Sequence, residues 1–207
     1  MQIVLQYALH IDQYLFAFVT TYGAWAYAVL FAIIFCETGL VITPFLPGDS
    51  LLFAAGSIAA NAGQHALHIQ WLFILLSIAS IAGNQVNYMI GRWLGPHMLW
   101  MVNKKYLADA HAFYERHGGK TIILARFIPI IRVFVPFVAG MSEMQPTQFI
   151  AYNVISGIIW IGSLLAAGYF FGTLPFIQAN FSLVIYAIVA ISLLPAIGTY
   201  LYQRLKA

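Results

Sequence analysis

The stretch from Trp71 to Gly95 is apolar over almost its whole length and contains a single charged side chain, Arg92. A helix needs about 20 predominantly apolar residues to cross the hydrocarbon core of a bilayer, and this stretch is long enough. Two further stretches, 149–172 and 181–202, have the same apolar character. These three stretches predict transmembrane spans and leave little of the 207-residue chain for a water-soluble domain.

The composition supports a membrane location for the whole chain. Hydrophobic residues make up 62% and charged residues 7%, against roughly 45–50% and about 25% in soluble domains. A net charge of +3 is too small for a nucleic-acid-binding surface, and the single Cys36 excludes an internal disulfide. No Lys or Arg precedes Arg92, so a cleavable signal peptide is not expected. The sequence therefore predicts an all-α integral membrane protein forming one membrane domain over 1–207.

Two apolar segments are interrupted by helix-breaking residues. The first, 22–60, contains Pro44, Pro47 and Gly48, and the arm that follows would cover under ~20 Å, too short for a core of about 30 Å. The second, 121–142, contains Pro129, Pro136 and Gly140. Each segment is predicted to form a re-entrant hairpin, which needs surrounding protein or a watery cavity at membrane depth.

The remaining segments complete the predicted topology. Residues 1–20 have the period of an amphipathic helix, either lying in the membrane interface or packed against the bundle. The segment 97–120 holds Lys104, Lys105, Arg116 and Lys120 and is predicted to be a partly helical loop. Basic residues favour the cytoplasmic side, so this loop and the C-terminus, with Arg204 and Lys206, are expected there.

The two halves of the chain resemble each other. Phe53-Ala54-Ala55-Gly56 in the first half recurs as Phe137-Val138-Ala139-Gly140 in the second, and Gly91-x-x-x-Gly95 recurs at a similar offset as Gly168-x-x-x-Gly172. Each half thus contains a broken hairpin and a span. Because the two hairpins open on opposite faces, the sequence predicts an inverted repeat, an arrangement typical of transporters.

Four ionisable residues lie within the predicted hairpins: Glu37, Asp49, Arg126 and Arg132. Each would cost roughly 2.5–3.5 kcal/mol at the bilayer centre if unpaired. We expect them to meet near the middle of the membrane, where the arginines can hold a phosphate and the acids can exchange protons. Two other interpretations stay open: a purely structural ion-pair network, and Asp49 as the N-cap of the arm that starts at Ser50.

Other polar residues give weaker indications. Asn84 and Asn87 lie inside the first span, where they either contact a neighbouring helix or line a path. His65 and His68 are interpreted as interfacial residues, so no metal site is predicted. No motif for a nucleophile, a phosphate-cradling glycine loop or a cofactor is found. The sequence therefore predicts a protein that is not an enzyme and has no cofactor.

Three segments resemble the DedA family of bacterial inner-membrane proteins, which is related to the VTT-domain lipid scramblases of eukaryotes: FCETGLVITPFLPGDSLLFAAG (35–56), GNQVNYMIGRWLG (83–95) and HGGKTIILARFIPIIRVFVPFVAGM (117–141). The resemblance implies two opposed re-entrant hairpins. It also implies that Glu37, Asp49, Arg126 and Arg132 are essential. Asn84 departs from the family pattern, because relatives often have aspartate at this position.

The resemblance implies a role in membrane homeostasis that depends on the proton gradient. Together with the charged residues, it predicts a translocase that is linked to the proton-motive force. Glu37 and Asp49 would couple protons, and Arg126 and Arg132 would bind the phosphate of a lipid. The expected ligand is undecaprenyl phosphate, recycled across the inner membrane, or a phospholipid. The alternatives are an antiporter of small cations and protons, and a membrane-homeostasis factor that transports nothing; both a monomer and a homo-oligomer are compatible with the sequence.

Overall fold

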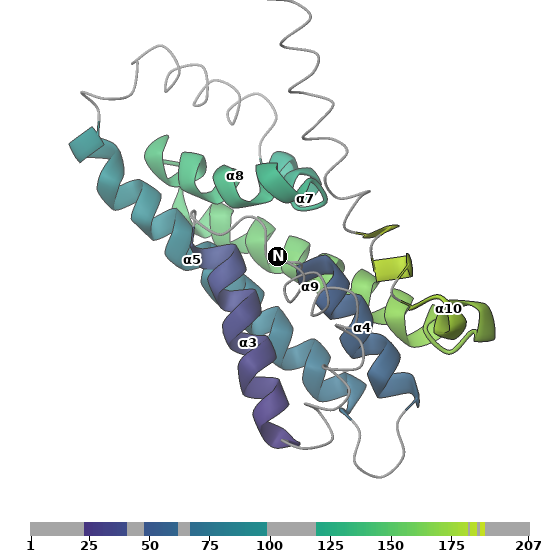
Figure 1. The fold of residues 1–207 in the computed structure, drawn as a ribbon. Coiled ribbons are helices and arrows are strands. Elements are labelled where there is room, and N and C mark those ends of the chain that lie inside the picture. Colours follow the sequence, from purple (N-terminus) through teal and green to yellow (C-terminus); the bar gives the residue numbers. More distant parts are fainter. Residues whose placement is uncertain are drawn as a thin grey trace, which may run out of the picture. The chain divides into compact units, whose positions relative to one another are not determined.

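A computed structural model describes residues 23–40, 48–61, 67–98, 119–181, 183–185 and 187–188 of the chain. The predictions for 1–20, for most of 97–120 and for most of 181–202 lie outside these residues. Within them the regular structure is helical (Figure 1): α3 (Ala24–Gly39), α4 (Gly48–Asn61), α5 (Ile69–Met98), α7 (Lys120–Ala125), α8 (Pro129–Met141), α9 (Pro146–Phe171) and α10 (Pro175–Ala179).

Two of the described helices are long and apolar enough to cross a membrane. In α5 the apolar part is Ile69–Leu94, and in α9 it is Pro146–Phe171, each of 26 residues. Pro146 occupies the first position of α9, where its missing N–H removes no intrahelical hydrogen bond. The predicted helical fold with apolar spans is confirmed for these two segments.

The two predicted hairpin breaks differ in what the structure describes. In the first segment α3 ends at Gly39 and α4 begins at Gly48, and Pro44 and Pro47 lie outside the described residues. In the second segment α7 ends at Ala125 and α8 begins at Pro129, with Pro129 at the helix N-terminus, where proline is favourable.

Pro136 and Gly140 do not break the second hairpin, which corrects the prediction. Both lie inside α8, which continues to Met141. A proline within a helix removes the hydrogen bond to the carbonyl four residues earlier, here that of Arg132, and membrane helices tolerate this where neighbouring helices and side chains bind the backbone. In the turn before Pro136, the Val133 carbonyl accepts a hydrogen bond of 2.8 Å from Asn87 Nδ2. Gly140 has a different role, because it lets α8 approach another helix closely.

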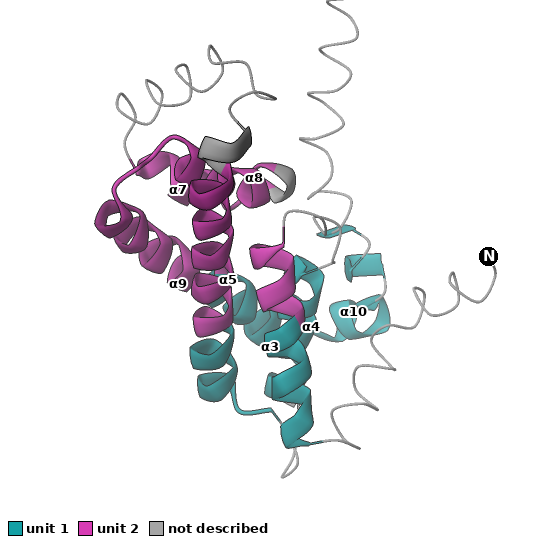
Figure 2. Cartoon of the chain, turned by 90° about the vertical axis from the view of Figure 1, so that its left-hand side faces the viewer, with its two compact units in different colours: residues 1–32, 47–76, 161–207 teal, residues 33–46, 77–160 magenta. Residues whose placement is uncertain are grey.

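The chain divides into two compact units (Figure 2). Unit 1 comprises residues 1–32, 47–76 and 161–207, and unit 2 comprises 33–46 and 77–160. The helices α3, α5 and α9 each contribute residues to both units.

In unit 1, α4 packs against the second half of α9 through glycines. A Cβ on Gly168 would overlap the carbonyl group of Phe53, and a Cβ on Gly56 would overlap the backbone of Leu165 and Tyr169. Around this contact Phe53, Ala54 and Ile185 form a buried cluster. Small residues at such contacts let helix backbones approach closely in a membrane.

In unit 2, α8 packs against the second half of α5 in the same way. A Cβ on Gly91 would overlap the carbonyl group of Phe137, and a Cβ on Gly140 would overlap the backbone of Tyr88 and Arg92. The buried cluster beside this contact contains Tyr88, Ile122, Ala139, Met144 and Phe149. The rings of Tyr88 and Phe149 are stacked with centroids 4.3 Å apart.

The glycine contacts of the two units correspond residue by residue. The contact between Gly168 and Phe53 matches the one between Gly91 and Phe137, at the offsets that relate the two sequence halves. The backbone groups that lie against Gly56, those of Leu165 and Tyr169, match Tyr88 and Arg92 against Gly140 at the same offsets. The similarity seen between the sequence halves therefore extends to the contacts that each half makes.

We expect Gly91→Ala to lower the free energy of unfolding by about 1–3 kcal/mol, because the added Cβ meets a backbone carbonyl that no rotamer change can move. Gly162→Ala is the matched control. Its Cβ would lie 3.3 Å from Phe73 Cε2, the end of a side chain that can shift. The midpoint of thermal unfolding in detergent measures both variants, and equal effects would contradict the assigned contact.

A second prediction concerns the end of α8. The amide of Glu143 donates to the Gly140 carbonyl and that of Met144 to the Ala139 carbonyl, both at 3.1 Å, which is the Schellman pattern of a helix C-terminus. Glu143 has a φ of 55°, a left-handed conformation that favours glycine. We expect Glu143→Gly to raise the free energy of unfolding by about 1 kcal/mol.

The neighbouring residue provides the control for this prediction. Ser142 has a φ of −83°, and its Oγ donates to the Val138 carbonyl at 2.9 Å. Ser142→Gly gains no relief of strain and loses this hydrogen bond, so it should lower the unfolding midpoint. A lower midpoint for Glu143→Gly as well would refute the proposed backbone strain.

Candidate functional site

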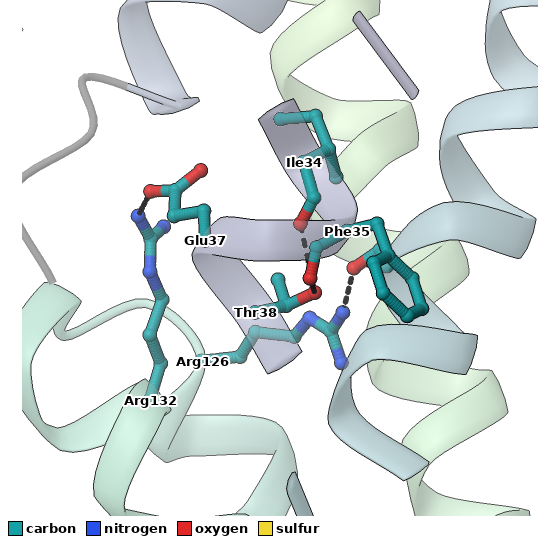
Figure 3. A network of polar contacts seen from close by, with 7 residues as sticks. Ile34, Phe35, Glu37, Thr38, Arg126 and Arg132 are labelled. Atoms are coloured by element: carbon teal, nitrogen blue, oxygen red, sulfur yellow. Dashed lines mark hydrogen bonds and ion pairs between the residues drawn. The ribbon is translucent and has the colours of Figure 1, made fainter. Parts of the chain in front are cut away.

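Glu37 and Arg132 form a buried ion pair within unit 2. Glu37 lies in the last turn of α3 and Arg132 in the first turn of α8, and Arg132 Nη2 donates to Glu37 Oε1 (Figure 3). The carboxylate is 0% exposed and the guanidinium side chain 6% exposed. Two oppositely charged side chains predicted to lie at membrane depth are thus brought together, 95 positions apart in the sequence.

Asn87 on α5 holds the backbone on both sides of this ion pair. Its Nδ2 donates to the carbonyl of Thr38, the residue after Glu37, at 3.3 Å. The same Nδ2 donates to the carbonyl of Val133, the residue after Arg132, at 2.8 Å. Asn87 is fully buried. The structure therefore supports the interpretation of Asn87 as a helix contact, and this contact aligns the two charged residues.

Arg126 is bound differently, although the sequence suggests that it is equivalent to Arg132. It follows directly after α7 and is 2% exposed. Its guanidinium group donates to Ser80 Oγ on α5, to Ser156 Oγ on α9 at 3.1 Å and to Asn153 Oδ1 on α9 at 3.2 Å. All three partners are neutral, and among the described residues Arg126 has no carboxylate partner. Figure 3 shows its side chain extending away from the ion pair.

Asn153 is the centre of a small amide network that positions Arg126. Its Oδ1 also accepts from Asn84 Nδ2 at 3.2 Å, and its own Nδ2 donates to the Ile81 carbonyl at 2.9 Å. Asn84 is therefore a helix contact between α5 and α9. Both oxygen acceptor positions of Asn153 and one of its donors are used, so its orientation is fixed by three hydrogen bonds.

Trp160 lies against both arginines. The Cζ atom of Arg126 is 5.4 Å and that of Arg132 4.8 Å from the ring centroid. Cations within about 6 Å of an indole face are stabilised by the ring quadrupole, and more strongly where water is excluded. Trp160 is 2% exposed. One buried aromatic ring therefore stabilises two guanidinium groups that repel each other.

The other predicted site residues have these positions. Asp49 is half-buried in the first turn of α4 and belongs to unit 1. Because α4 begins at Gly48, Asp49 is inside the helix instead of being its N-cap, and a carboxylate there is favourable to the helix dipole. Gly48 starts the helix, and His65 lies outside the described residues.

The sequence interpretation missed four buried residues of this cluster: Ser80, Asn153, Ser156 and Trp160. One available signal was the spacing of Ser77, Ser80, Asn84 and Asn87, which places four polar side chains on one face of α5. A second signal was Asn153, a lone amide in an otherwise apolar part of the second span.

Comparisons with known proteins agree with these motifs. The VTT domain family model matches residues 46–170. Protein DedA of Escherichia coli (strain K12) is 51% identical over 199 residues, which cover 94% of this chain and 90% of that protein. Uncharacterized membrane protein Rv0364 of Mycobacterium tuberculosis is 42% identical over 80% of this chain and 74% of that protein. Inner membrane protein YqjA of E. coli (strain K12) is 36% identical over 72% of this chain and 69% of that protein.

No solved structure matches the chain. The part of this chain that matches the family model, residues 46–170, includes Asp49, Arg126 and Arg132. It begins after Glu37. The names of Rv0364 and YqjA describe membrane proteins, which agrees with the two helices of this chain, α5 and α9, that are long and apolar enough to cross a membrane. The chain therefore belongs to the DedA family of VTT-domain membrane proteins.

Proposed function

We propose that the protein is a proton-linked translocase of a phosphate-bearing lipid. Undecaprenyl phosphate, recycled across the bacterial inner membrane, is the preferred ligand and a phospholipid the second candidate. The observation that carries the proposal is Arg126, a buried guanidinium group whose hydrogen-bond partners are all neutral. A buried cation needs a compensating anion, and the planar guanidinium group matches phosphate geometry.

The charge balance of the cluster supports an anionic ligand. Arg126 and Arg132 carry two positive charges, and Glu37 carries one negative charge, so the described cluster of unit 2 has a formal charge of +1. Charged side chains inside membranes usually mark a path for substrates, ions or protons. In the proposal the arginines bind the phosphate, Glu37 and Asp49 exchange protons, and the lipid tails remain in the bilayer. No covalent chemistry and no cofactor are needed, so the proposed protein is not an enzyme.

We further propose that the fold is an inverted repeat of two re-entrant hairpins. The helices α3, α4 and α8 have 16, 14 and 13 residues, which corresponds to about 20–24 Å and is shorter than a hydrocarbon core of about 30 Å. The corresponding glycine contacts in the two units support a duplicated half. In this proposal the loop 97–120 and the C-terminus face the cytoplasm, as their basic residues favour.

The decisive experiment uses purified protein in vesicles of zwitterionic lipid with a polyprenyl phosphate in one leaflet. We expect the lipid to reach the other leaflet faster than in empty vesicles, and faster still with a pH difference across the membrane. Cation-dependent pH changes in the same vesicles without the polyprenyl phosphate would instead indicate an antiporter of small cations and protons. No movement of polyprenyl phosphate or of fluorescent phospholipid would refute the proposal.

A further inference from the structure

The two arginines of the cluster hold different kinds of partner. Arg132 is paired with the carboxylate of Glu37, whereas Arg126 is bound by two hydroxyl groups and one amide oxygen. The cation of Arg126 is therefore available to an anion without breaking an ion pair. The cation of Arg132 becomes available only when Glu37 releases it.

The surroundings of Arg126 suit a phosphate group. The hydroxyl groups of Ser80 and Ser156 accept from the guanidinium group. Ser156 Oγ donates its own hydrogen to the Asn153 carbonyl at 3.1 Å, whereas the hydroxyl hydrogen of Ser80 can be donated to a phosphate oxygen. Asn153 is fixed by its hydrogen bonds to Asn84 and to the Ile81 carbonyl, so it orients Arg126. Arg126 and Ser80 thus present donors of hydrogen bonds without a competing carboxylate among the described residues, and Ser156 helps to hold Arg126 in place.

Arg132 lies close enough to contribute to the same site. Both guanidinium groups contact the ring of Trp160, with Cζ atoms 5.4 Å and 4.8 Å from its centroid. Arg126 also interacts electrostatically with both Arg132 and Glu37. Among the described residues of unit 2, the basic groups that interact with Glu37 are Arg132 from α8 and, more distantly, Arg126 from the end of α7. The other acid among the described residues of unit 2, Glu143, lies beyond the far end of α8.

We propose that Glu37 and the phosphate of the ligand compete for Arg132, so that a phosphate monoester and a proton bind together. This inference rests on the proposed function. When Glu37 is ionised, it occupies Arg132, and the cluster offers a charge of +1 to the ligand. When Glu37 is protonated, Arg132 turns to the phosphate, and the cluster offers +2, which matches the dianion of a phosphate monoester.

The competition links the affinity for phosphate to the pH on each side of the membrane. On the side of lower pH, protonation of Glu37 releases Arg132 and strengthens phosphate binding. On the side of higher pH, Glu37 loses its proton, pairs again with Arg132 and weakens binding. The release of Arg132 also favours phosphate monoesters over phosphodiesters. A phosphodiester carries one negative charge, so the second arginine increases its binding affinity less than that of a monoester dianion.

The test measures binding of geranylgeranyl monophosphate to the full-length protein in phosphatidylcholine nanodiscs by calorimetry. The dissociation constant at about pH 6.5 is compared with that at about pH 8. The second pKa of a phosphate monoester is near 6, so the dianion prevails in this range. For the wild type we expect tighter binding at the lower pH, by up to about 30-fold for one linked proton. Repeating the titration in buffers of different ionisation enthalpy should show uptake of close to one proton without any substitution.

Three variants separate the competition from a structural ion pair. Glu37→Gln should bind tightly at both pH values and take up no proton, because Arg132 is permanently released. Arg132→Gln should bind weakly at both. Arg92→Gln, an exposed arginine outside the cluster, should behave like the wild type. If the Glu37→Gln variant keeps the pH dependence of the wild type, or binds as weakly as Arg132→Gln, the inference is wrong.

The outcomes also distinguish this inference from the proposed function. Wild-type binding that is independent of pH overturns the competition and leaves the lipid-phosphate translocase standing. Proton-linked binding without lipid movement in vesicles supports the competition and counts against translocation. No binding of geranylgeranyl monophosphate at either pH, with phospholipid movement intact, overturns the monoester site and leaves a phospholipid translocase.

Discussion

Arg126→Gln should reduce the rate of lipid-phosphate movement in vesicles by about 100-fold or more. Hydrogen bonds to charged groups contribute about 1.5–3 kcal/mol each, and a guanidinium group makes two of them to one phosphate. Loss of both costs about 3–6 kcal/mol, and 1.4 kcal/mol corresponds to a factor of ten. The glutamine side chain would keep hydrogen-bonding capacity toward Ser80, Ser156 and Asn153 but would carry no charge.

Arg92→Gln is the matched control for this variant, because it removes an exposed arginine of the same unit that binds Tyr88 Oη at 3.0 Å and does not touch the charged residues of the site. Its transport rate should remain within about a factor of two of the wild type. Arg126→Lys adds a second comparison, since lysine keeps the charge and loses the planar fork. Wild-type transport by Arg126→Gln would remove Arg126 from the mechanism.

The second large effect concerns stability. We expect Arg132→Met to lower the free energy of unfolding by about 3–5 kcal/mol near neutral pH, because Glu37 is left as a buried carboxylate without its counter-ion. Unfolding in detergent, followed by circular dichroism, measures the change. The loss should be smaller at acidic pH, where Glu37 becomes neutral by binding a proton.

A double variant tests the origin of this loss. Adding Glu37→Gln to Arg132→Met removes the uncompensated charge and should recover most of the lost stability, since replacing both members of a buried pair is often close to neutral. Additive losses in the double variant would mean that the two residues contribute independently. The interaction energy from the four proteins gives the strength of the pair directly.

The spans α5 and α9 were predictable because their signal is local. A run of apolar residues of sufficient length forms a helix in a bilayer whatever its neighbours are. The local signal of Pro136 and Gly140 was misleading, because the effect of each residue depends on the neighbouring helix. Both residues break helices in water-soluble proteins, but in α8 the helix continues, with Gly140 against the backbone of α5 and Asn87 bonded to the turn before Pro136.

The candidate site was predictable in its charged members and not in their roles. Glu37, Arg126 and Arg132 stand out because ionisable groups are rare in apolar segments. Which partner each arginine binds depends on where α3, α5, α8 and α9 approach one another. A contact between residues 95 positions apart, such as that of Glu37 with Arg132, cannot be predicted from residue spacing. Ser80 and Ser156 look like ordinary small residues of a helix contact until the position of Arg126 is known.

Because Trp160 lies beside both arginines, its fluorescence can report on the state of the site. The emission of an indole responds to charge nearby, and here the two guanidinium groups lie 5.4 Å and 4.8 Å from the ring centroid. A chain whose other tryptophans are all changed to phenylalanine would retain Trp160 as its single tryptophan. Every exchange of Arg132 between carboxylate and phosphate would then shift its emission, so that the occupancy of the site could be followed in real time without a label.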